Sequence, residues 1–193
     1  MYITEHYIHR NTKSKHRLER KPLMNASIKI DHVAVMVNDL EKSLHFYRDL
    51  LGLEVVSPEE HNDGPISEMV AIPKVHMREY RLRAPDGIHG HTRNEGPGFT
   101  LDLIQWLNPA SPIERYPINH VPSAHICFGV EDVPATYERL KAAGVEFVSP
   151  PVRFTGEGEW HVLFFYDPDG NLLELNEIGT GQQVVHEYDW SNA

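Results

Sequence analysis

Two stretches of the chain decide its fold. Residues 31–58 read DHVAVMVNDLEKSLHFYRDLLGLEVVSP, and residues 124–150 read AHICFGVEDVPATYERLKAAGVEFVSP. The two stretches align with a one-residue gap, and the alignment places His32 opposite His125. Because internal similarity at a fixed spacing indicates a repeated structural unit, the sequence predicts one module that occurs twice.

Each copy has the pattern of a βαβββ module. In the first copy, apolar residues recur at helical spacing after Asn38 or Asp39, either of which suits a helix N-cap, and Gly52 suits the helix end. For the first module we expect a strand at 28–37, a helix at 39–50, a strand at 53–57, an irregular stretch, and strands near 75–83 and 99–107. For the second module we expect a strand at 124–130, a helix at 132–143, and strands at 145–149, 160–166 and 171–178. The fold class predicted is α+β, with duplicated βαβββ modules that form a cupped mixed sheet.

The same pattern divides the chain into segments. The stretch NPASPIERYPINHVP contains four prolines and cannot form a regular element. The predicted division is a basic N-terminal extension at 1–27, a first module at 28–107, a proline-rich linker at 108–122, a second module at 123–178 and a tail at 179–193. Residues 28–178 are expected to form one domain.

Composition narrows the possible partners. The chain has 193 residues, a formal net charge of −10 and one cysteine. An acidic body argues against nucleic acid as a partner, and one cysteine excludes an internal disulfide framework. No apolar stretch is long enough to span a membrane, and the N-terminus lacks the apolar core of a signal peptide. We therefore expect a cytoplasmic protein with a small-molecule partner and no membrane partner.

Strand alternation places one histidine and one carboxylate on the same face in each module. In the first module, packing of alternate apolar residues against the helix leaves His32 and Asp102 on the opposite face. In the second module the same alternation leaves His125 and Glu174 there. Two imidazoles and two carboxylates suit one divalent transition metal, namely Mn, Fe, Co, Ni or Zn. The sequence therefore predicts a metal site built from these four residues, half from each module.

These stretches, together with FYDPDGNLLELNE, resemble the vicinal oxygen chelate superfamily of glyoxalases, bleomycin-resistance proteins and dioxygenases. The resemblance covers roughly residues 28–178 and is closest in pattern to glyoxalase I-like and methylmalonyl-CoA epimerase-like members. It implies metal ligands at His32, Asp102, His125 and Glu174, although such enzymes more usually have Glu or Gln where Asp102 stands. Gln105 would need a bulge to substitute for Asp102.

The resemblance also implies a reaction. It suggests a metal-dependent isomerase, epimerase or lyase that acts on a small oxygen-chelating substrate through an enediolate, with Glu174 as ligand and proton carrier. His161 is a further candidate acid or base. One alternative is an Fe(II) ring-cleaving dioxygenase, and another is a metal-free ligand-binding protein of the bleomycin-resistance type. A homodimer is possible, because such sites form either within one chain or between two.

Overall fold

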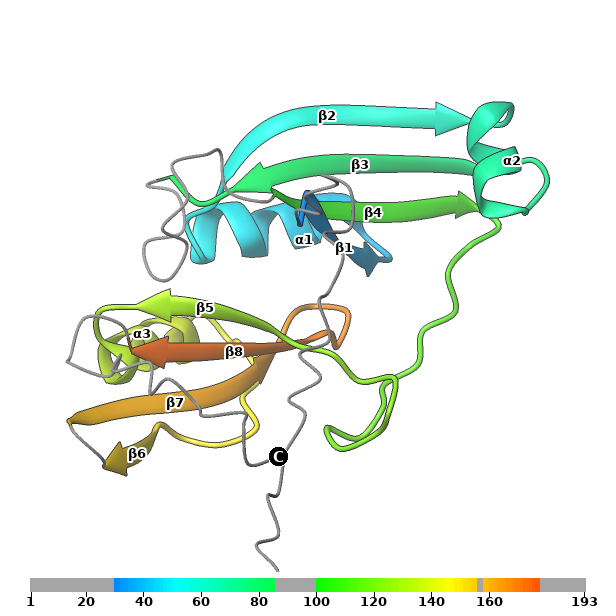
Figure 1. Cartoon of the computed structure of the whole chain (residues 1–193). Coiled ribbons are helices and arrows are strands. Elements are labelled where there is room, and N and C mark those ends of the chain that lie inside the picture. Colours follow the sequence, from blue (N-terminus) through cyan, green and yellow to red (C-terminus); the bar gives the residue numbers. More distant parts are fainter. Residues whose placement is uncertain (1–29, 86–99, 156–157, 178–193) are drawn as a thin grey trace, which may run out of the picture.

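The computed structural model describes residues 30–85, 100–155 and 158–177. It contains two modules of the predicted kind (Figure 1). The first consists of β1 (His32–Val37), α1 (Leu40–Leu44), η1 (His45–Leu50), β2 (Glu54–Asn62), α2 (Pro65–Val70), β3 (His76–Arg83) and β4 (Thr100–Asn108). The second consists of β5 (Ile126–Val130), α3 (Val133–Ala142), β6 (Val152–Thr155), β7 (Glu159–Tyr166) and β8 (Leu172–Glu177). The predicted fold class is confirmed.

The two modules have the same sheet topology. The first sheet has the strand order β1-β4-β3-β2 and the second has the order β5-β8-β7-β6. In each sheet the first and last strands of the module run parallel, and the other neighbours run antiparallel. No ladder of hydrogen bonds joins the two sheets within the described ranges.

Both main helices begin and end in the same way. Asp39 Oδ1 accepts a hydrogen bond from Lys42 N at 3.0 Å, and Asp132 Oδ1 accepts one from Ala135 N at 2.8 Å. Each side chain thereby satisfies one of the free N–H groups at the start of a helix. Gly52 and Gly144 follow the helices with φ of 83° and 84°, a conformation that glycine adopts without strain.

Three local predictions were wrong. Strand β2 continues to Asn62, well beyond the predicted end at residue 57, and the stretch expected to be irregular contains the short helix α2. The strand expected at 145–149 is reduced to a single bridge between Phe147 and Phe165, and the outer strand β6 lies further along the chain. The linker at 108–122 has no helix or strand beyond the last residue of β4, as its prolines predicted.

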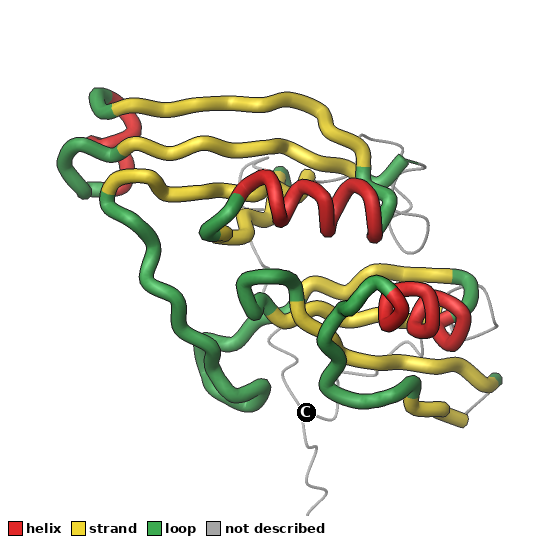
Figure 2. The backbone as a smooth tube through the Cα atoms, turned by 180° about the vertical axis from the view of Figure 1, so that it is seen from behind, coloured by secondary structure: helices red, strands yellow, loops and turns green. Residues whose placement is uncertain are grey.

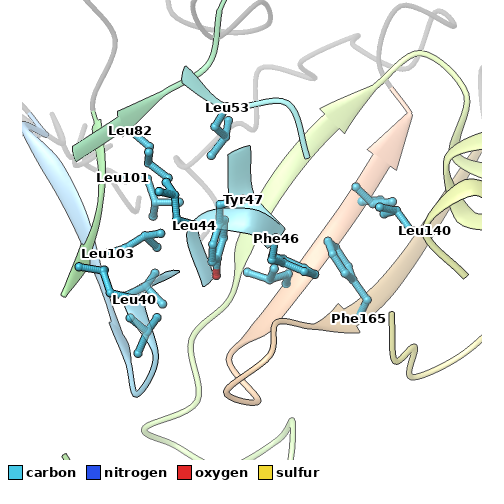
Figure 3. Packing of buried hydrophobic residues seen from close by; sticks show 14 of the residues in the cluster. Leu40, Leu44, Phe46, Tyr47, Leu53, Leu82, Leu101, Leu103, Leu140 and Phe165 are labelled. Atoms are coloured by element: carbon cyan, nitrogen blue, oxygen red, sulfur yellow. The ribbon is translucent and has the colours of Figure 1, made fainter. Parts of the chain in front are cut away.

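One hydrophobic core is shared by the two modules. It contains Leu101 and Leu103 of the first sheet together with Leu173 and Leu175 of the second, and each of these is at most 5% exposed. Figure 2 shows α1 and η1 on the side of the first sheet that is nearer to the second module. In Figure 3 Phe46 points from η1 toward Phe165 of β7, whose ring centroid lies 6.3 Å away. The helix-side faces of both sheets are therefore buried together. No helix in the described part of the chain is long and apolar enough to cross a membrane.

Candidate metal centre

All four predicted ligands lie on, or at the start of, strands whose helix-side residues fill the core. Asp102 stands between buried Leu101 and Leu103, and Glu174 stands between buried Leu173 and Leu175. Because side chains alternate along a strand, both carboxylates project from the sheet faces opposite the shared core. In the structure, both acids therefore lie on the sheet face that the sequence predicted for them.

His125 and Glu174 form a close pair on the second sheet. His125 comes one residue before β5, and its Nε2 lies 2.9 Å from Oε2 of Glu174 on β8. The side chain of Glu174 is 14% exposed and that of His125 is 44% exposed. The ring of Phe164 packs edge-on against the imidazole, with centroids 5.1 Å apart. One nitrogen and one oxygen donor therefore meet beside an apolar wall, with His125 still open to solvent.

Cys127 lies beside this pair. It is directly opposite Glu174 in the β5–β8 ladder. Although the residue as a whole is exposed, desolvation of the thiol and the neighbouring Glu174 carboxylate raise the pKa of Cys127 to about 12. The thiol therefore stays protonated at neutral pH and is no nucleophile, because nucleophilic attack requires the thiolate.

Asp102 is engaged by neighbours on its own sheet. Arg81 donates from Nε to Oδ1 at 3.3 Å and from Nη2 to Oδ2 at 3.4 Å, and the Thr100 hydroxyl donates to Oδ1 at 3.1 Å. The Asp102 side chain is only 3% exposed. Both of its oxygens thus already have donors, so a metal ion at Asp102 would compete with Arg81.

His32 is the most open of the four. Its Nδ1 lies 3.0 Å from Oδ2 of Asp31, and its side chain is 47% exposed. The hydrogen bond with Asp31 raises the pKa of His32, and the charge of Asp102 adds to this increase. The negative charge of Asp102 therefore acts on His32, although no hydrogen bond joins these two described side chains.

The structure assembles the four residues as two separate pairs. No hydrogen bond or ion pair between described residues joins His32 or Asp102 to His125 or Glu174. None of the four belongs to a group of three potential ligands with all their donor atoms within 4.8 Å, again among described residues. In the described part of the chain, the candidate ligands thus lie as one pair on each sheet, and we refer to these pairs as half-sites.

His161 lies on the other face of the second sheet. On β7 it shares a face with buried Leu163 and Phe165, and its Nδ1 lies 3.0 Å from Oε2 of Glu177. Glu177 is 7% exposed and accepts the N–H of Val133 at the start of α3. The structure therefore does not bring His161 together with Glu174. Gln105 is likewise on the helix side, where it bonds to the backbone of Asn38 and Leu40. The sequence also offers His89, His91 and Arg93, in the stretch 88–98, as candidates to bind a carboxylate or phosphate, and these three lie outside the described residues.

The sequence prediction missed a second group of potential ligands. Glu59, His61 and Glu79 have donor atoms within 4.8 Å of one another on the first sheet. Glu59 and His61 stand two residues apart, and this spacing places both on one face of a strand. The pattern was visible in SPEEHN, but the strand was expected to end before it.

Comparison with known proteins agrees with this architecture. The family model described as Glyoxalase/Bleomycin resistance protein/Dioxygenase superfamily matches residues 29–175. An ethylmalonyl-CoA/methylmalonyl-CoA epimerase from Cereibacter sphaeroides is 28% identical over 156 residues, which cover 78% of this chain and 98% of the epimerase. A lactoylglutathione lyase from Pseudomonas aeruginosa is 30% identical over 161 residues, which cover 78% of this chain and 86% of the lyase.

A solved structure shows the same fold. A glyoxalase family protein from Bacillus cereus superposes with a TM-score of 0.68 at 18% identity, over 80% of this chain and 97% of that protein. Since the family model matches most of the chain and includes both half-sites, the chain belongs to the glyoxalase/bleomycin resistance protein/dioxygenase superfamily.

Proposed function

We propose that this protein is a metal-dependent enzyme of the lyase, isomerase or epimerase kind, acting on a small substrate that offers two neighbouring oxygens. The observation that carries the proposal is the 2.9 Å contact between His125 and Glu174 on the face away from the core. An imidazole nitrogen and a carboxylate oxygen are suitable donors for Mn, Fe, Co, Ni or Zn. The similarity to an epimerase and a lactoylglutathione lyase supports this class of reaction.

The substrate class follows from the relatives and from the chemistry of the donors. The two relatives named above act, by their names, on an acyl-CoA and on a glutathione thioester. The substrate class that we propose is a thioester, or the hemithioacetal formed from a carbonyl compound and a thiol. In either case the substrate has an acidic C–H next to a carbonyl. A bound divalent metal would polarise such a carbonyl as a Lewis acid.

Glu174 is suited to move the proton in this reaction. Its carboxylate is largely buried beside Cys127 and Phe164, and the protonated thiol donates to it. A carboxylate held in this position can act as a general base toward an acidic C–H within hydrogen-bond reach. His125, held by the Phe164 ring edge, keeps a nitrogen beside Glu174 and thereby fixes where a substrate oxygen can bind.

The complete site requires a second chain. Each half-site projects from a sheet face opposite the core that the two modules share, and among the described residues no hydrogen bond or ion pair joins the half-sites. In the proposed dimer, His125 and Glu174 meet His32 of the partner subunit. Asp102 of the partner subunit would complete the set only by giving up part of its contact with Arg81. Two equivalent sites per dimer follow from the two-fold symmetry.

Metal content tests the proposal most directly. After reconstitution, His125→Ala and Glu174→Gln should each contain about one equivalent of transition metal per chain fewer than wild-type protein. His161→Gln is the matched control, because His161 belongs to the same sheet but lies on its opposite face. Equal metal content in all four proteins would refute the site.

Activity assays then separate the reactions. Turnover of an acyl-CoA epimer or of a glutathione hemithioacetal, lost in Glu174→Gln, is the expected result. Oxygen consumption with a catechol would indicate the ring-cleaving alternative instead. Tight binding of a ligand by metal-free protein without turnover would indicate the bleomycin-resistance type.

A mixing experiment tests the dimer. His32→Ala and His125→Ala chains are each expected to be inactive alone. In a mixed dimer with sites between chains, one site carries both substitutions and the other carries none. Co-expression should therefore restore activity, whereas sites within single chains would stay inactive. Light scattering checks that the wild-type protein has the mass of a dimer.

A further inference from the structure

A group of acidic and imidazole side chains on the first sheet is not used by the proposed reaction. Glu59 and Glu79 stand directly opposite each other on β2 and β3, and His61 lies opposite Met77 on the same face. Their donor atoms lie within 4.8 Å of one another. Like charges directly opposite in a sheet repel each other and are destabilising. The arrangement therefore needs a compensating positive charge.

Glu79 shows that this compensation is incomplete. Its side chain is 8% exposed, and no donor among residues 30–85, 100–155 and 158–177 forms a hydrogen bond with it. Arg81 forms an ion pair with it at 3.9 Å. Burial raises the pKa of Glu79, and the charges of Glu59 and Asp102 raise it further. The charge of this carboxylate is therefore met by a long ion pair and not by a direct hydrogen bond.

Arg81 cannot balance all of its neighbours. It lies 3.8 Å from Glu59 and 3.9 Å from Glu79, but it bonds to Asp102 through two nitrogens at 3.3 and 3.4 Å. Leaving aside His61, whose Nε2 lies 3.6 Å from Glu59, the three carboxylates and one guanidinium have a formal net charge of −2. A single divalent cation would neutralise it.

The second module lacks this group. The ladders place Val152 and Val162 where the first sheet has Glu59 and Glu79, and Phe154 where it has His61. Phe154 stacks on Trp160 at 5.8 Å, so the equivalent surface is apolar. The charged group is therefore particular to the first module and does not follow from the shared fold.

We propose that Glu59, His61 and Glu79 form a second binding site for a divalent cation, separate from the site at His125 and Glu174. One imidazole and two carboxylates suit Zn²⁺, Mn²⁺ or Fe²⁺. Because the three residues come from β2 and β3, the bound ion joins the outermost strand of the sheet to its neighbour. Because the ion neutralises Glu59 and Glu79, Arg81 can pair with Asp102 alone.

Cobalt titration of the full chain tests this site. Co²⁺ is a spectroscopic substitute for these ions, and its visible absorption counts bound equivalents. We expect Glu79→Gln and His61→Gln each to bind one equivalent fewer than wild type. Glu60→Gln is the matched control, because Glu60 is the neighbouring acid on the opposite face of β2 and pairs with His76. An equal number of equivalents in all four proteins would overturn the proposal.

The proposals for the two metal sites can be tested separately. A His125→Ala/Glu174→Gln protein should lose a different equivalent and keep the one that depends on Glu79. If it loses none while Glu79→Gln still loses one, the proposed catalytic site is wrong and this second site stands. The opposite pattern would overturn the second site alone. Circular dichroism confirms that each variant is folded.

Thermal unfolding separates a cation site from simple repulsion between acids. Glu79→Gln should be more stable than wild type without metal, because the substitution removes a buried charge. Added Zn²⁺ should raise the Tm of wild type and of Glu60→Gln more than that of Glu79→Gln. The same Zn²⁺ response in wild type and Glu79→Gln would reduce the group to an uncompensated acidic cluster and overturn the proposal.

Discussion

Tyr47 donates its phenolic hydrogen to Asp167 at 2.9 Å, across the boundary between the two modules. Tyr47 is 0% exposed on η1, and Asp167 is 5% exposed in the turn between β7 and β8. The same carboxylate accepts the backbone N–H groups of Asp169 and Asn171. One buried acid therefore organises its own turn and anchors the first module to the second.

Tyr47→Phe should destabilise the protein by about 1.5–3 kcal/mol, since it removes a buried hydrogen bond to a carboxylate. Chemical denaturation measures the change. Tyr116→Phe is the control, because Tyr116 is exposed and bonds only to exposed Glu114, so its effect should stay within about 0.5 kcal/mol. Equal effects of the two substitutions would mean that the Tyr47 bond contributes nothing.

The stability that depends on Asp167 should increase as the pH falls. Burial raises the pKa of Asp167 above its ordinary value, although its hydrogen bonds partly offset this. The folded protein therefore binds a proton at Asp167 more readily than the unfolded chain does. This contribution is fully present below the unfolded pKa and is lost as the pH rises through the folded pKa.

Asp167→Asn isolates this contribution. We compare the free energies of unfolding of wild type and variant. The value for wild type minus the value for the variant should become more positive as the pH is lowered from about 7 toward 4. Denaturation curves at several pH values provide the comparison. A difference that stays constant, or that shrinks on acidification, contradicts the assigned direction of the pKa shift.

Phe165→Ala should cost about 3–5 kcal/mol, because it opens a cavity in the shared core. Phe165 is fully buried and packs on Phe46 of the first module and Phe147 of the second. Both modules should lose stability together. Trp106 of β4 and Trp160 of β7 report on the two modules, each in a variant in which the other two of the three tryptophans are replaced by Phe. Two separate transitions would show that the modules unfold independently.

Much of the architecture was predictable because alternation and helix spacing are local. The buried positions of Val35, Leu101 and Leu173 follow from period-two patterns that a repeat reinforces. The end of β2 was not predictable in this way. Pro58 suggested that the strand stops, but β2 is the outer strand of its sheet, where a residue without an N–H is tolerated.

The environment of the candidate site depends on register, which the sequence does not reveal. Arg81 meets Asp102 only because β3 pairs with β4 in one particular alignment. The connection between these strands is long and does not fix their register as a two-residue turn would. Glu79 was missed for the same reason, since its opposition to Glu59 is a property of the β2–β3 ladder.

Arg81→Gln should destabilise the protein by about 2–3 kcal/mol. The loss of one partner of a buried ion pair costs about 3–5 kcal/mol, and the side chain of Arg81 is one-third exposed, which reduces this value. Of the donors to Asp102 in the described part of the chain, the substitution leaves the Thr100 hydroxyl alone, and Asp102 is nearly inaccessible to solvent. Urea denaturation of metal-free protein gives the change.

Arg83→Gln is the matched control for this experiment. Arg83 is on the same strand but pairs with exposed Glu54, so its loss should cost less than about 1 kcal/mol. The Arg81 variant should also gain more stability from added Zn²⁺ than the Arg83 variant does. Without the guanidinium, the carboxylates of Glu59, Glu79 and Asp102 have no ion pair with another Arg or Lys among the described residues, and only Glu59 pairs with an imidazole, that of His61 at 3.6 Å. If both variants respond to Zn²⁺ equally, Arg81 and the ion do not share the same carboxylates.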